Sequence, residues 1–364
     1  MFFHSDYTLG LSAVFLPYNG YLHLVPRLIA IAASFFDPLW IPGCYVYASL
    51  LLTLYVAART QTRRMPFKTH AGFALAVALV PDAPDGLLNP TNLQFILACS
   101  LILLLISIDP ATPRELVHDV VALLLLGLTG PFSVVLAPLF LLRALLRRSR
   151  TSWILASIGI VTGLIQVWMI IRHPLQLPPA PDERMDLSYL FAVPGSRLAG
   201  SLLLGHFFPA RPSLLALNLA GIATLALIGY LACRHERYRW PRLMIGACCV
   251  LLLASALFRQ RMTLPSMAGF GFGSRYFYGP QLLVLWLLML SHFDSRVKSR
   301  VLHGALLVFL AVNLPRLREP AMIDFHWASY APKIRNGEAV DIPINPDWTI
   351  PLPARKPSSN RTGK

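Results

Sequence analysis

The first candidate site lies near the N-terminal end of the chain, where a histidine and an arginine have residue types suited to a phosphate ligand and an aspartate has the type of a base. His23 and Arg27 lie in YLHLVPR, and Asp6 lies upstream of them. An arginine presents a planar fork of donors that matches a phosphate or pyrophosphate. A carboxylate such as Asp6 can act as a general base. The alternative is an arginine that snorkels to a membrane surface beside interfacial tyrosines.

A second polar group lies in PDAPDGLLNPTNLQ, residues 81–94, and includes Asp85, Asn92 and Gln94. Carboxylate and amide side chains suit a sugar, and the spacing of Asp82 and Asp85 can also hold a hard divalent cation. The metal itself stays unassigned. Asp-Gly and Asn-Pro are turn signals, so turn and helix-cap chemistry is the alternative interpretation.

The third group follows a glycine-rich run, GFGFGSRYFYGP, and contains Arg275, Tyr276 and Tyr278, with Arg259 and Arg261 upstream. Glycines allow close backbone approach to a ligand, and arginine with tyrosine at a membrane surface suits a phosphate head group. The alternative is a flexible loop with an aromatic anchor. The pattern matches neither a Walker A motif nor a dinucleotide fingerprint.

The elements that hold these groups must be membrane helices. The chain has 364 residues, of which 55% are hydrophobic and 13% charged, and its mean hydropathy is +0.58. Soluble domains carry about 25% charged residues, so a soluble globular enzyme and a disordered chain are both excluded. Apolar blocks of roughly 15 to 22 residues match a bilayer crossing. We therefore expect an all-α, multi-pass transmembrane bundle of about ten or eleven helices, some short or broken, over 20–36, 40–58, 70–81, 90–107, 114–128, 131–145, 151–171, 212–233, 241–258, 276–293 and 299–314.

The positive charge gives the expected orientation. The formal net charge is +15, but the basic residues concentrate in loops between apolar blocks, at 59–68, 143–150, 234–242 and 296–300. Such loops are cytoplasmic under the positive-inside rule, and this placement argues against a nucleic-acid partner. The loops at 82–90, 127–131, 172–211 and 259–275 then lie outside. One conflict remains, because a full crossing by 20–36 puts the loop at Arg59 on the wrong side.

We expect three regions along the chain. Residues 1–19 form an interfacial outer segment that lacks a signal peptide and reads as truncated at its N-terminus. Residues 20–315 form the transmembrane domain. Residues 316–364 form an extracytoplasmic tail, in which IPINPDW is extended and turn-rich and can pair as strands or cap the membrane face. The end of the tail, ARKPSSNRTGK, is expected to be disordered.

Several segments together resemble a known superfamily. PYNGYLHLVPRLIA, NPTNLQF, GLTGPFSVVLAPLFLLRA, SRYFYGP and IPINPDW resemble poorly characterised bacterial multi-pass proteins that look like relatives of the GT-C glycosyltransferases. The resemblance covers about residues 17 to 350. It implies a protein of the bacterial inner membrane and cell envelope that transfers a sugar from a polyprenyl-phosphate or pyrophosphate donor on the extracytoplasmic face. Its partners would be membrane lipids, this lipid-linked sugar donor and a glycan or lipid acceptor.

The resemblance also implies roles for particular residues. In that superfamily an acidic residue of the first outer loop acts as a base or binds metal. That loop is expected just before residue 1, and Asp6 is the nearest carboxylate. Asp85 looks like the second outer acidic position and Arg275 like a donor-phosphate ligand. His23, Arg27, Asn92, Gln94, Tyr276 and Tyr278 complete the expected substrate site, and a divalent cation is the one cofactor considered.

Two other functions stay open. A flippase or transporter for an envelope glycan or lipid-linked oligosaccharide needs a polar path across the bilayer, for which His118, Asp119, Gln166 and Asn218 are the candidates. A non-catalytic membrane subunit would suit a truncated first loop. The preference for a transferase rests on resemblance at the level of the fold.

Overall fold

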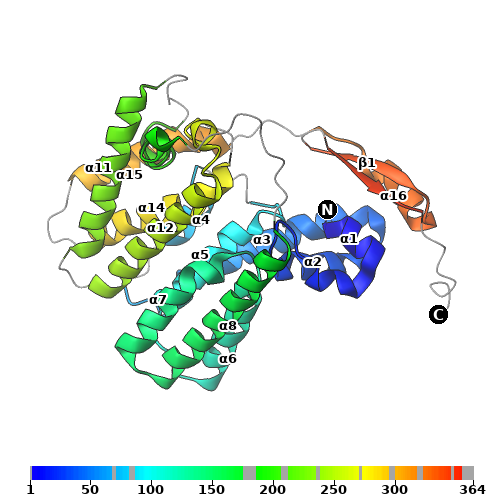
Figure 1. The fold of residues 1–364 in the computed structure, drawn as a ribbon, viewed down its shortest axis with the longest axis horizontal. Helices are drawn as coiled ribbons and strands as arrows, with labels where there is room; N and C mark the ends of the chain where they lie inside the picture. Colours follow the sequence, from blue (N-terminus) through cyan, green and yellow to red (C-terminus); the bar gives the residue numbers. More distant parts are fainter. Residues whose placement is uncertain are drawn as a thin grey trace.

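The chain is mostly helical in a computed structural model (Figure 1). The structure describes residues 2–67, 71–81, 87–174, 186–205, 212–234, 238–269, 273–294, 300–317, 323–345 and 348–354. Its longer helices are α2 (Leu24–Ser34), α3 (Ile41–Arg59), α4 (Ala71–Leu79), α5 (Leu93–Ile106), α6 (Pro113–Gly127), α7 (Phe132–Arg147), α8 (Arg150–Arg172), α11 (Leu214–Cys233), α12 (Arg239–Arg259), α14 (Tyr278–Asp294) and α15 (Arg300–Asn313).

Each expected apolar segment corresponds to one of these helices, and local signals set several boundaries. α6 begins at Pro113 and is preceded by a capping box. The Thr112 hydroxyl accepts a hydrogen bond from the Glu115 N–H, and the Glu115 carboxylate accepts one from the Thr112 N–H. The Ser149 side chain caps α8. Among the described residues, four helical segments are long and apolar enough to cross a membrane: Pro38–Arg59, Arg150–Arg172, Leu214–Cys233 and Arg239–Arg259.

Helix α5 forms the centre of the core. Every residue from Leu93 to Ile106 is buried, and the helix packs against α3, α6, α7, α12 and α14. A helix that is apolar all round is covered either by neighbouring helices or by lipid, and here neighbouring helices cover every face of α5. The ends of α5 are therefore fixed in space, and its first turn can position side chains precisely.

Three of the basic loops lie at the same end of the helices, which we name the basic end. Arg64 pairs with Asp119 of α6 and donates to the Ile108 carbonyl, just after α5. The Arg147 guanidinium, at the end of α7, lies 5.9 Å from the centre of the Trp240 ring at the start of α12. The loops that follow α3, α7 and α11 thus gather on one side, as the positive-inside rule predicts for a membrane protein.

The short helix α2 resolves the conflict over the first hairpin. Its 11 residues extend about 16 Å, against about 30 Å for the hydrocarbon core of a bilayer. His23, just before α2, pairs with Thr129 at the far end of α6, so α2 begins opposite the basic end and cannot reach it. α3 follows and ends at Arg59, which lies 3.6 Å from the Asp119 carboxylate. Of the two alternatives left open for the first hairpin, this arrangement favours the one in which 20–36 does not cross fully, so that the Arg59 loop lies with the other basic loops.

The C-terminal segment forms a small unit, which we name the cap. It comprises α16 (Trp327–Asn336) and the antiparallel strands β1 (Val340–Ile344) and β2 (Trp348–Leu352), drawn in orange and red beside α1 (Phe2–Leu9) and α2 in Figure 1. The Trp327 indole N–H donates to the Pro38 carbonyl at 2.8 Å, and Arg335 pairs with Asp37 at 2.6 Å. The described part of IPINPDW is extended, as the sequence predicts.

Two glycines allow α11 to cross the helical segment 191–200 at close range. A Cβ on Gly221 would lie 1.9 Å from the Phe191 carbonyl oxygen, and one on Gly195 would lie 1.9 Å from the Leu217 carbonyl oxygen. Backbone oxygens cannot move away without separating the helices. Only glycine therefore fits at these two positions.

Gly221→Ala is expected to destabilise the protein by about 1–3 kcal/mol, because the added methyl forces the helices apart. The measurement is thermal unfolding of the protein in lipid nanodiscs. Gly229→Ala is the matched control on the same helix, since no atom lies within 4 Å of its Cβ position. Equal melting temperatures for the two variants would contradict the close crossing.

Candidate functional site

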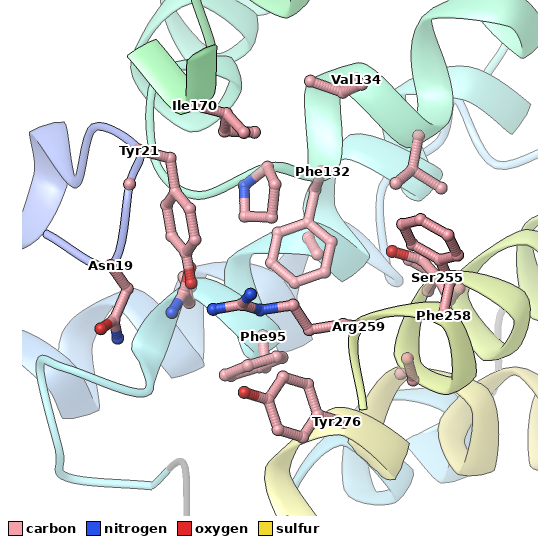
Figure 2. Close-up of a pocket in the computed structure, with 18 of the residues that line it drawn as sticks. Asn19, Tyr21, Phe95, Phe132, Val134, Ile170, Ser255, Phe258, Arg259 and Tyr276 are labelled. Atoms are coloured by element: carbon pink, nitrogen blue, oxygen red, sulfur yellow. The ribbon is translucent and has the colours of Figure 1, made fainter. Parts of the chain in front are cut away.

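A cavity of about 350 Å³ lies at the end of the helices opposite the basic end. We name it the Arg259 cavity. Its walls come from the Asn19–Tyr21 turn, the first turns of α5, α7 and α14, and the last turns of α8 and α12 (Figure 2). The polar and aromatic lining includes Tyr21, Gln94, Phe95, Phe132, Arg259 and Tyr276.

Arg259 supplies the positive charge of this cavity. It is the last residue of α12, and its side chain extends between Phe132 and Tyr276 toward Tyr21 (Figure 2). Within the described part of the chain, its guanidinium has no ion pair or hydrogen bond. A half-buried arginine without a carboxylate partner is a ready site for an anion, because its fork of donors matches a phosphate.

Aromatic rings form the wall beside this charge. The Phe95 ring packs edge-on against Phe132 at 5.5 Å and against Tyr276 at 5.4 Å, measured between ring centres. The apolar lining continues through Ile170 to Phe258, whose side chain is 72% exposed. The cavity is thus polar around Arg259 and apolar toward the outer surface of the helices, which is the pattern of a site for an amphiphile.

The Tyr21 hydroxyl is a hydrogen-bond donor in this cavity, not a base. Burial, followed by the neighbouring Tyr276, raises the pKa of Tyr21 to about 12, and the Gln94 side chain and the Arg259 charge only partly offset this. The phenol therefore keeps its proton at neutral pH. The Gln94 side chain is 4% exposed, and its Oε1 has no hydrogen-bond partner within the described residues.

A tight turn holds Tyr21 in place. Asn19 and Gly20 have φ angles of 55° and 86°, which reverse the chain before Tyr21. The next residue, Leu22, receives a hydrogen bond from Gly130 N–H at 2.8 Å and donates to Gln166 Oε1 of α8 at 2.9 Å. Gln166 therefore fixes the turn against the bundle, which gives a structural reason for an amide in that helix.

Gln166→Leu is expected to destabilise the protein by about 1–3 kcal/mol, because the Leu22 amide and carbonyl lose a partner while buried. Thermal unfolding in nanodiscs checks this loss. The control is Leu164→Ala, at a position of the same helix that is 63% exposed. An unchanged melting temperature for Gln166→Leu would mean that the turn is not held through α8.

His23 and Arg27 support this turn from behind and do not line the cavity. The His23 ring is fully buried and lies 4.8 Å from the Tyr21 ring and 5.3 Å from the Tyr18 ring, centre to centre. Burial and the nearby Arg27 lower the pKa of His23 to about 3, so it is neutral at physiological pH. Arg27 donates to the Leu16 carbonyl at 3.0 Å.

The third sequence group separates in the structure. Tyr276 lines the cavity, whereas Arg275 is exposed and its guanidinium lies 5.5 Å from the Tyr276 ring centre. Tyr278 is fully buried, and its hydroxyl donates to the Val77 carbonyl at 2.8 Å. The structure therefore assigns Tyr278 to the core. It also brings in Arg259, which the sequence analysis grouped with this site but did not include among the expected substrate-site residues.

The remaining candidates are only partly described. Asn92 immediately precedes α5 and does not appear in the cavity lining. Asp6 belongs to α1, which packs against α2 and the cap. Asp85 and the neighbouring Asp82 lie outside the described residues. Among the residues that the structure describes, no three His, Cys, Asp or Glu side chains gather as metal ligands.

The class of protein follows from the fold and the site. Four described helices are long and apolar enough to cross a membrane, and with basic loops at one end and an amphipathic cavity at the other they indicate a helical membrane protein. Comparison with protein-family models, with curated proteins and with solved structures finds no match to this chain.

Proposed function

We propose that this protein binds a polyprenyl-phosphate or pyrophosphate sugar in the Arg259 cavity and transfers the sugar to an acceptor. The observation that carries this proposal is the unpaired Arg259 guanidinium inside a cavity with an apolar wall. A lipid-linked phosphate has the same two parts, a charged head and a hydrocarbon chain. The resemblance of the sequence to GT-C glycosyltransferases supports the same donor class.

The donor would bind with its phosphate on Arg259 and with the Tyr21 hydroxyl as a second donor. The prenyl chain would leave along Phe132 and Ile170, the apolar part of the lining. Charge-assisted hydrogen bonds in a site with little water are strong. Arg259 would also offset the charge that develops on the phosphate as the sugar departs.

The transfer needs a base as well. In the proposed step a carboxylate takes the proton of an acceptor hydroxyl, the hydroxyl oxygen attacks the anomeric carbon of the sugar, and the bond from that carbon to the phosphate oxygen breaks with its electron pair on the phosphate. The described lining of the Arg259 cavity contains no aspartate or glutamate. We assign the base to Asp85, because it precedes the Asn89–Gln94 segment that leads into the cavity.

The orientation is part of the proposal. The basic loops would face the cytoplasm of a bacterium, so that the protein crosses the inner membrane several times and presents the Arg259 cavity on the extracytoplasmic face. An activated sugar carried by a lipid is reached there from the bilayer surface.

Reconstituted vesicles with a panel of polyprenyl-phosphate sugars, labelled in the sugar, test the reaction. Asp85→Asn is expected to abolish transfer and to keep donor binding, whereas Arg259→Ala is expected to lose both. Asp341→Asn, on an exposed position of β1, is the control. Donor binding without transfer by the unchanged protein would contradict the transferase and favour the non-catalytic subunit.

The described polar residues do not favour a transporter. Asp119 is paired with Arg59 and Arg64 at the basic end, and Gln166 is bound to the Leu22 backbone. Asn218 donates to the Ser188 carbonyl at 2.9 Å. These groups serve the packing of helix ends and loops and do not form a path between the two ends.

A further inference from the structure

A second cavity, of about 400 Å³, lies between the cap and the body of the protein. We name it the Trp327 cavity. Its floor comes from α1 and the first turn of α3, its side from residues 89–91, and its roof from the cap. Its volume lies in the range of small-molecule sites.

The rings of this cavity are held in fixed positions. The hydrogen bond from the Trp327 indole to the Pro38 carbonyl anchors one edge of that ring, and Phe3 packs edge-on against it with 6.0 Å between ring centres. Tyr45 and Tyr330 also line the cavity. Trp327 and Tyr330 are each half-buried, so part of each ring surface remains for a ligand.

Neutral and acidic polar groups lie among these rings. Asp324 lines the cavity with a side chain that is 79% exposed. One of its oxygens accepts from the His326 N–H at 2.8 Å and the other lies 3.4 Å from the His326 ring nitrogen Nδ1, so the carboxylate is held in place and keeps exposed surface for a ligand. The Asn89 side-chain oxygen Oδ1 accepts from the Thr91 N–H at 2.9 Å, and because Asn89 is exposed its side-chain NH2 group can reach a ligand. Asn345 is bound to the Ile323 backbone at 3.2 and 3.0 Å and shapes the edge of the cavity. The polar lining thus offers a carboxylate and an amide but no arginine or lysine.

We propose that the Trp327 cavity binds a saccharide. One face of a pyranose ring presents C–H groups that pack on an aromatic ring, while its hydroxyls pair with carboxylate and amide groups at the rim. Both kinds of group are present here. A phosphate head group is disfavoured, because the charged side chain in this lining is Asp324 and like charges repel. The charged side chain in the described lining of the Arg259 cavity is an arginine, which suits a phosphate. In the described lining of the Trp327 cavity it is an aspartate, which suits the hydroxyls of a sugar.

One short segment of the chain borders both cavities. Asn89 and Thr91 line the Trp327 cavity, and Gln94 and Phe95, in the following turn, line the Arg259 cavity. A saccharide held under the cap would lie next to a donor held by Arg259. That this saccharide is the acceptor rests on the proposed function, whereas the binding of a saccharide in the Trp327 cavity does not.

Saturation-transfer NMR tests binding, with maltose, cellobiose and N,N′-diacetylchitobiose as probes and the full chain in lipid nanodiscs. Nanodiscs are needed because maltoside and glucoside detergents carry sugars themselves. We expect a signal for at least one disaccharide, reduced at least about tenfold in affinity by Asp324→Ala, which loses a charge-assisted hydrogen bond. Thr91→Val, which removes a hydroxyl at nearly constant volume, is the second variant and should also weaken binding.

Two controls separate this proposal from the donor site. Asp341→Ala removes an exposed carboxylate of the same cap that does not line the cavity, and Arg259→Ala changes the other cavity. Both should leave disaccharide binding unchanged. Absence of binding by all three probes, or equal binding by the Asp324→Ala and unchanged proteins, would overturn the proposal. Loss of binding in Arg259→Ala would also overturn it, by moving the sugar to the Arg259 cavity.

Discussion

Arg259→Ala is expected to weaken binding of polyprenyl phosphate by about 10- to 150-fold. Hydrogen bonds to charged groups contribute about 1.5–3 kcal/mol, and each 1.4 kcal/mol is about a tenfold change in affinity. No described acid neutralises the Arg259 guanidinium, so a bound phosphate interacts with the full positive charge of Arg259. The measurement is native mass spectrometry or microscale thermophoresis of the protein in nanodiscs with a polyprenyl phosphate.

Arg261→Ala is the matched control for this effect. Arg261 follows Arg259 closely and has the same charge, but its side chain is exposed and donates to the Phe258 carbonyl at 3.1 Å. It does not line the cavity. Arg259→Lys should bind more tightly than Arg259→Ala, because lysine keeps the positive charge but lacks the planar fork of N–H donors. Equal affinities for Arg259→Ala and Arg261→Ala would mean that the phosphate binds elsewhere.

Asp109→Ala is expected to destabilise the protein by about 3–5 kcal/mol, because it leaves a buried charge uncompensated. Asp109 lies 2.6 Å from Arg143 and 2.8 Å from Arg147. The Arg143 side chain is fully buried and also donates to the carbonyl of Ser107 at 3.1 Å, just after the end of α5. The pair therefore fixes the basic end of α5 to α7. Thermal unfolding measures the loss, and Asp341→Ala should change stability by less than about 0.5 kcal/mol.

The same pair gives an expected dependence on pH. Burial alone would raise the pKa of Asp109, but hydrogen bonds from Ser149 and the two arginines outweigh it and lower the pKa to about 2. An unfolded aspartate has a pKa of about 3.9. Its contribution to stability is therefore complete above about pH 4 and is lost as the pH falls toward 2. Asp109→Ala should lack this part of the acid transition, and an identical acid transition in both proteins would contradict the assignment.

The apolar segments were sufficient to predict the helices, because crossing lengths and turn residues are local properties. The role of α2 was not predictable from its composition, since an apolar stretch near bilayer length is compatible with both a crossing and an interfacial helix. Its 11 residues and the pairing of His23 with Thr129 favour the interfacial helix. The tail was predicted as an extended segment that can pair as strands or cap the membrane face, but the surface that it covers was not predicted, because that surface is distant in sequence.

The candidate site was predictable in part. Gln94 and Tyr276 were selected from polar residues at helix ends, and the structure places both in the Arg259 cavity. Tyr278 was selected for the same reason, but it lies two residues further along, at the start of α14, and its ring is buried in the core. Arg259 was grouped with the third site but not selected, because its isolation from acids depends on tertiary structure. The sequence signal that it offered was an arginine at the end of a long apolar helix that the charge rule places outside.

Photocrosslinking tests the central claim, that the Arg259 cavity holds a lipid-linked phosphate, most directly. A polyprenyl phosphate with a diazirine near the head group would be irradiated with the protein in nanodiscs, and the modified peptides would be identified by mass spectrometry. The expected adducts lie on the cavity wall, at Phe132, Ile170 or Phe258, and disappear in Arg259→Ala but persist in Arg261→Ala. Adducts confined to the basic end, or adducts that are insensitive to Arg259→Ala, would contradict the claim.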